Sequence, residues 1–176
     1  MNNIYCNDDV LSDFLCDDII ELFNDNDNDS LIIPKHCNKW NKIEKILYRE
    51  LLINIKKYKN KILNNILNKN DKDISEVCKM IDKDMYLKHF KIIKIVNDNN
   101  NLVYNLREKN RYNVISFIYF LNDSIDGKLL FNELNFSIKP QKGTLLLFPD
   151  NINYINVFSL LDEYCYIITG QIYNNN

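Results

Sequence analysis

The chain has 176 residues, a formal net charge of −2 and 46% hydrophobic residues. This length suits one well-packed domain and is short for two, so we expect a single domain over residues 1–176, mainly helical over residues 1–82 and mainly strands over residues 86–173. Because acidic and basic residues are mixed along the whole chain, the charge gives no reason to expect nucleic acid or a membrane surface as the partner.

The composition carries two further signals. The chain contains no alanine but is rich in Asn, Ile and Lys, a bias typical of a protein encoded by an AT-rich genome. Its five cysteines are odd in number and include no Cys-x-x-Cys pair, and the chain begins with the polar Asn2 and Asn3 instead of a basic, apolar signal sequence. These features predict a protein of the reducing cytoplasm.

Two amphipathic helices are predicted early in the chain. The first has Ser12 as its expected N-cap and places apolar residues of 14–23 on one face. The second runs from Trp40 to Ile66, with apolar residues spaced by three or four and charged residues on the other face. We expect this apolar stripe to pack on a sheet rather than to serve as a ligand for a partner's groove. A shorter helix is predicted at Ile74–Ile81.

The loop between the first two helices resembles a calcium site only superficially. Asp25, Asp27 and Asp29 alternate as ligands do in an EF-hand loop. The sixth and twelfth positions, which need Gly and Glu, hold Ser30 and His36. We therefore expect a solvated loop, followed by a short extended segment.

The second half of the chain is predicted to form short strands. Phe90–Val96 and Leu102–Arg107 flank a polar turn. Val114–Leu121, Leu145–Phe148 and Tyr166–Thr169 are nearly unbroken runs of β-branched and aromatic residues, the pattern of strands buried on both faces. Turn residues bound these runs, and short strands at close spacing are typical of a sandwich or barrel.

Five segments of this half share their order and spacing with one enzyme family. They are Tyr119–Asn122, Asp126–Phe131, Pro140–Gly143, Leu145–Pro149 and Cys165–Gly170. The chain thus resembles the prolyl 4-hydroxylase-like branch of the iron(II) and 2-oxoglutarate-dependent oxygenases, and its first predicted helix resembles the first helix of that family. The resemblance implies an α+β fold, with a double-stranded β-helix (jelly roll) core and the N-terminal helices packed on the sheet.

The resemblance also implies where a catalytic site would lie. The family binds iron(II) through a His-x-Asp pair and a later histidine, and a Lys or Arg before the closing strand pairs with 2-oxoglutarate. On this chain these positions fall at Asn105, Arg107, Asn156 and Cys165. An amide is a poor substitute for imidazole, a guanidinium repels a cation, and a thiol cannot pair with a carboxylate as a fixed cation does. The resemblance therefore implies a degenerate member of the family that uses neither iron(II) nor 2-oxoglutarate.

The register of the first pair has an alternative. A shift by one residue would place the His-x-Asp equivalents at Tyr104 and Leu106. We prefer Asn105 and Arg107, because these two polar residues then share one face of the strand. Neither register contains a histidine or a carboxylate.

The two histidines of the chain occupy none of the family's ligand positions. His36 precedes the long helix and His89 precedes a strand, where a histidine with ordinary hydrogen bonds is common. His36 and Cys37 could form half of a zinc site, but no second pair shows ligand spacing. We expect neither histidine to bind a metal.

These observations favour a catalytically inactive prolyl hydroxylase-like protein that binds a protein partner or regulates one. A large DNA virus is one source that fits the composition, and the protein would then act in the host cytoplasm as a decoy. One alternative is an active oxygenase with an atypical metal site that includes His89. A second is a metal-free pocket in which Arg107 binds an anion.

Overall fold

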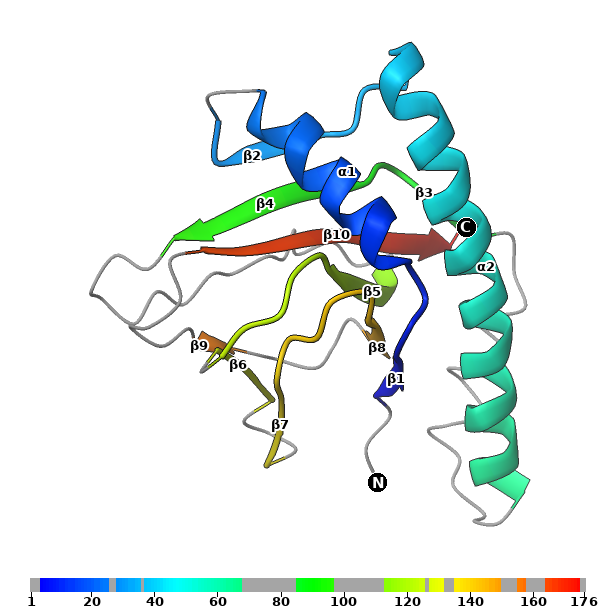
Figure 1. The fold of residues 1–176 in the computed structure, drawn as a ribbon. Helices are drawn as coiled ribbons and strands as arrows, with labels where there is room; N and C mark the ends of the chain where they lie inside the picture. The colour runs from blue at the N-terminus through cyan, green and yellow to red at the C-terminus, as the bar shows by residue number, and fades with distance from the viewer. Residues whose placement is uncertain are drawn as a thin grey trace.

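A large antiparallel sheet carries two helices on one face and a smaller sheet on the other (Figure 1). The computed structural model describes residues 4–25, 28–35, 37–67, 85–96, 113–125, 127–131, 135–149, 155–157 and 164–174. The predicted helix at Ile74–Ile81 and the predicted strand at Leu102–Arg107 lie outside these residues. Among the helices described, none is long and apolar enough to cross a membrane.

Over the described residues the large sheet has seven strands, of which six follow the order β1-β8-β5-β10-β4-β2, while β3 pairs with β10. Their bounds are β1 Tyr5–Asn7, β2 Ser30–Ile32, β3 Met85–Leu87, β4 Lys91–Val96, β5 Asn113–Phe120, β8 Leu145–Pro149 and β10 Tyr164–Asn174. The small sheet has the order β7-β6-β9, with β6 Lys128–Phe131, β7 Phe136–Ile138 and β9 Ile155–Val157. All strand pairs among the described residues are antiparallel.

Helices α1 (Asp13–Asn24) and α2 (Asn38–Leu67) cover one face of the large sheet. The Oγ atom of Ser12 accepts a hydrogen bond from the backbone N–H of Leu15 at 3.3 Å, which confirms Ser12 as the N-cap of α1. Buried residues on both helices share one apolar cluster with the sheet. The expectation that the N-terminal helices pack on the sheet is confirmed.

Strands β5, β8 and β10 of the large sheet are buried on both faces, as the sequence predicts. Along β10, Tyr166 and Ile168 face the helices, whereas Cys165 and Ile167 face the small sheet. Strands β5 and β8 alternate in the same way. The unbroken apolar runs arise because each of these strands contributes to two cores at once.

Strand β10 is longer than the predicted strand Tyr166–Thr169. It pairs with β5 on one side and with both β4 and β3 on the other, so backbone hydrogen bonding extends it beyond its apolar run. Strands β1 and β2 come from the part of the chain that we expected to be mainly helical, and each pairs at an edge of the sheet.

Candidate functional site

The candidate site is the interior between the two sheets, where the resemblance would place the metal and the cosubstrate. Strands β4, β5, β8 and β10 of the large sheet and β6 of the small sheet contribute side chains to it. Ten of these side chains are buried together: Ile93, Ile95, Ile118, Phe120, Leu129, Phe131, Leu146, Phe148, Cys165 and Ile167. Over the described residues, this part of the interior is filled by aliphatic and aromatic groups and one thiol.

Aromatic rings pack tightly in this interior. The centroids of the Phe131 and Phe148 rings are 5.3 Å apart at an interplanar angle of 74°, an edge-to-face contact that joins the small sheet to the large one. Phe136 extends the contact on the small sheet, with its ring centroid 6.0 Å from that of Phe131. The two sheets are thus held together by apolar packing.

Cys165 lies at the interior-facing position near the start of β10. It is 1% exposed and pairs with Ile95 of β4, so its thiol belongs to the apolar cluster. A buried thiol behaves as a small hydrophobic group and packs readily among aliphatic side chains. A lysine or arginine at this place would bring a cation among Ile93, Ile95 and Ile167, where desolvation disfavours charge.

The interior becomes more polar toward the C-terminal end of β10. Ser116 of β5 pairs with Gln171 of β10, and both are buried. Thr169 is buried too, and its Oγ1 donates a hydrogen bond to the carbonyl oxygen of Phe117 at 2.9 Å. These groups are neutral, and over the part of the chain that the structure describes no charged side chain is buried.

Asn122 ties the end of β5 to the start of β10 on either side of Cys165. Its Oδ1 accepts from the backbone N–H of Tyr166 at 2.8 Å, and its Nδ2 donates to the carbonyl oxygens of Tyr164 at 3.0 Å and Asp123 at 3.1 Å. Sequence analysis did not assign this role to Asn122. The signal available was its place at the end of the Tyr119–Asn122 segment, directly after a strand.

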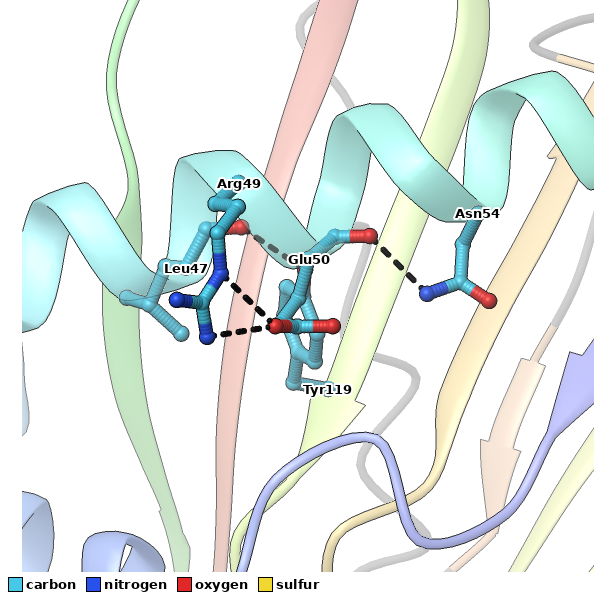
Figure 2. Close-up of polar contacts among 5 residues, drawn as sticks. All are labelled: Leu47, Arg49, Glu50, Asn54 and Tyr119. Atoms are coloured by element: carbon cyan, nitrogen blue, oxygen red, sulfur yellow. Dashed lines mark hydrogen bonds and ion pairs between the residues drawn. The ribbon is translucent and has the colours of Figure 1, made fainter.

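Polar contacts fix α2 on the opposite face of the sheet (Figure 2). The hydroxyl of the fully buried Tyr119 donates to the carbonyl oxygen of Leu47 at 3.1 Å. Burial raises the pKa of this phenol well above its usual value, and the negative charge of Glu50 adds to the shift. Figure 2 also shows Asn54, whose Nδ2 donates to the carbonyl oxygen of Glu50 at 2.9 Å.

The buried Asn54 connects α2 with β1 as well. Its Oδ1 accepts from the hydroxyl of Tyr5 at 3.0 Å and from Nδ2 of Asn7 at 2.8 Å. Every strong polar contact of this amide is therefore inside the protein, which suits a residue that is 1% exposed. These contacts stabilise the scaffold on the face away from the interior.

The structure places the remaining predicted site residues as follows. Asn156 lies in β9, directly opposite Leu129 of β6, a residue whose side chain is in the interior. Asn105 and Arg107 lie outside the described residues, as do the alternative register and His36. His89 is half-buried and directly precedes Phe90 and β4. Within the described ranges, no group of three or more His, Cys, Asp or Glu residues could hold a metal ion.

No protein-family model matches the sequence, and no curated protein does. Solved structures do match over nearly the whole chain. A viral collagen prolyl hydroxylase of Paramecium bursaria Chlorella virus-1 is 15% identical with a TM-score of 0.66, covering 99% of this chain and 91% of that one. A Pseudomonas putida prolyl-4-hydroxylase is 11% identical with a TM-score of 0.62, covering 100% and 95%.

A third similar structure is a Trichoplax adhaerens prolyl hydroxylase in complex with a peptide fragment of the hypoxia inducible factor oxygen degradation domain. It is 14% identical with a TM-score of 0.62, covering 99% of this chain and 84% of that one. At this level of identity the likeness concerns the fold. The chain has the double-stranded β-helix fold of the prolyl hydroxylases and related 2-oxoglutarate and iron(II) oxygenases, which confirms the predicted α+β jelly roll.

Proposed function

We propose that this chain is a degenerate prolyl hydroxylase-like protein that does not hydroxylate and that acts by binding a protein partner. The observation that carries the proposal is the environment of Cys165. Where the resemblance places the cation that pairs with 2-oxoglutarate, the chain has a cysteine packed among Ile93, Ile95 and Ile167. Among the residues that the structure describes, these aliphatic neighbours offer the cosubstrate carboxylate neither a charge nor a hydrogen-bond donor.

The chemistry of the other three positions supports the same proposal. Asn105 and Asn156 supply amides and Arg107 supplies a cation, a set that does not suit iron(II), which the family binds through imidazole and carboxylate. The register of β9, with Asn156 opposite the interior residue Leu129, agrees with the position that the resemblance gives to the late histidine. Fold alone does not carry activity, so the jelly roll can persist when its reaction is lost.

The partner, source and cell compartment belong to the proposal as well. The abundance of Asn, Ile and Lys, which is typical of an AT-rich genome, and the likeness to a viral prolyl hydroxylase support a large DNA virus as the source. The protein would then act in the host cytoplasm as a decoy for a host protein. The mixed charge of the chain favours a protein over nucleic acid or a membrane as the partner.

Native mass spectrometry and calorimetry with iron(II), manganese(II) and 2-oxoglutarate test the loss of activity. We expect no tight binding of either metal and no conversion of 2-oxoglutarate to succinate. Tight metal binding or turnover would overturn the proposal and establish an oxygenase with an atypical site. Binding of 2-oxoglutarate or another small acid without metal, lost in Arg107→Ala, would establish an anion pocket instead.

A second experiment tests the assigned positions. The combined substitutions Asn105→His, Arg107→Asp and Asn156→His should create measurable manganese(II) affinity, because they supply two imidazoles and a carboxylate. The matched control carries Tyr104→His, Leu106→Asp and Asn156→His and should bind no better than the original chain. If only the control binds the metal, the preferred register is wrong by one residue.

A further inference from the structure

A groove runs between α1 and the first half of α2 on the face away from the interior. Its volume is about 760 Å³, and the buried Leu11 and Ile43 form part of its floor. In Figure 1 the two helices lie beside each other near the start of α1 and diverge from there. The groove is therefore built from α1, α2 and the segment Val10–Ser12 that leads into α1.

The two sides of the groove carry opposite charges. Its α1 side has three acids, Asp18, Glu21 and Asp25, spaced by three and four residues so that they share one face. Its α2 side has Lys39 and Lys42. These five side chains are all exposed, and within the described part of the chain none of them forms an ion pair.

The remaining charges of the groove compensate each other. Arg49 binds Glu50 through Nε at 3.0 Å and Nη2 at 2.8 Å, as Figure 2 shows, so this pair adds little net charge to the α2 side. The groove thus presents an acidic α1 side and a basic α2 side that face the same space without contact.

The groove also exposes apolar surface. Phe14 lines it and is 76% exposed, the highest value among the exposed large hydrophobic residues that the structure describes. Leu15, Leu22 and Ile46 line it as well and are only partly buried. An exposed aromatic ring beside partly buried aliphatic groups, bordered by charges, is a surface typical of protein association.

We propose that this groove is the interface of a homodimer in which α1 of each copy lies against α2 of the other. An occupant must offer bases to α1 and acids to α2, and a second copy of this chain offers both. A two-fold axis parallel to the groove brings the acidic α1 of one copy opposite the basic α2 of its partner, twice. An axis across the groove would bring like charges together, so electrostatics selects one arrangement.

In this arrangement the ring of each Phe14 enters the groove of the other copy and is no longer exposed to water. The dimer does not depend on the loss of hydroxylase activity, because it uses the residues that line the groove and none of the residues that face the interior. The result of the metal and 2-oxoglutarate binding assays therefore neither supports nor contradicts the dimer.

Sedimentation equilibrium of the full chain tests the dimer. We expect a mass that rises with concentration from 21.0 kDa toward twice that value. Asp18→Lys with Glu21→Lys should raise the dissociation constant by about tenfold or more, since like charges then face each other, and so should Lys39→Glu with Lys42→Glu. Mixing the two variants should restore association. Both sides of the groove are then basic in one variant and acidic in the other, so each α1 side faces an α2 side of opposite charge.

The matched control is Lys56→Glu with Lys57→Glu, which changes the net charge equally at exposed positions of α2 outside the groove. It should dimerise as the original chain does, and circular dichroism should show that every variant is folded. A monomer at all soluble concentrations would overturn the proposal. So would a dimer that both reversals and Phe14→Ser leave unchanged, or reversed variants that do not associate when mixed.

Discussion

Cys165 of β10 lies directly opposite Ile95 of β4, and both side chains are buried in the interior between the two sheets. The described neighbours of a cation at this position would be aliphatic groups. We therefore expect Cys165→Lys to lower the free energy of unfolding by about 3 kcal/mol, as for an unpaired buried charge. Urea denaturation measures the loss. Cys165→Val, which keeps the site apolar, should change the stability by less than about 1.5 kcal/mol.

Comparing Cys165→Lys with Cys165→Val distinguishes a packed interior from an open cosubstrate pocket. If the interior at Cys165 were an open cosubstrate pocket, the lysine variant would be as stable as the valine variant. Equal midpoints and equal slopes in urea for both would thus argue against the packed interior.

Asn122 should be important for the closure of β10 onto β5. Asn122→Ala removes three hydrogen bonds and leaves the N–H of Tyr166 without its acceptor, so we expect a loss of about 1–3 kcal/mol. Hydrogen exchange at the Tyr166 amide should become faster. Asn122→Asp keeps the acceptor and should have a smaller effect; exchange that is unchanged in both variants would contradict this role.

Gly143 is required by its backbone conformation and by its neighbour. Its φ is +80°, and a Cβ atom added there would collide with the carbonyl of Leu11. The carbonyl oxygen of Gly143 also accepts from the N–H groups of Val10 and Leu11 at 2.9 and 3.1 Å. We expect Gly143→Ala to destabilise the protein by more than about 1 kcal/mol in thermal or urea unfolding.

Asn135 provides the control for Gly143, because its φ of 47° is also positive. Asn135→Gly relieves an unfavourable backbone conformation and should leave stability within about 1 kcal/mol of the original chain. If Gly143→Ala proves equally harmless, the close approach of residues 10–11 to the turn is not as described.

The buried Tyr119 predicts a loss of stability at alkaline pH. Because its pKa is raised in the folded state, the unfolded chain loses the phenolic proton first, from about pH 10 upward. Stability is fully present below that pH and falls as the pH rises toward the folded pKa. Tyr119→Phe should reduce this alkaline slope and also lose about 1 kcal/mol at neutral pH with the hydrogen bond to Leu47.

Cys16 contributes to the alkaline loss of stability in the same direction. Burial raises its pKa to about 11, so it too favours unfolding only at alkaline pH. Urea titrations at a series of pH values should show a partial effect in Tyr119→Phe and a larger one when Cys16→Ser is added. A slope that neither change affects would show that other groups control alkaline unfolding.

The elements with strong periodicity could be predicted from the sequence. The apolar stripe of α2, the cap at Ser12 and the unbroken runs in β5, β8 and β10 all lie where the residue pattern indicates. Strands β1 and β2 are three residues each; β1 has no such pattern, and β2 overlaps the short extended segment expected after the aspartate loop, but nothing in its sequence indicates its partner strand. They form because β8 and β4 offer unpaired edges to a passing segment, a circumstance that only the assembled sheet creates.

In the candidate site, too, some features follow from the sequence and others only from the tertiary structure. The sequence by itself determined that residues 165 and 167 share one face of the closing strand and residues 166 and 168 the other, because side chains alternate along any strand. Only the tertiary structure decided that the face of Cys165 meets the small sheet while that of Tyr166 meets the helices. Periodicity specifies which residues lie together, whereas the surface that covers them depends on segments distant in the chain.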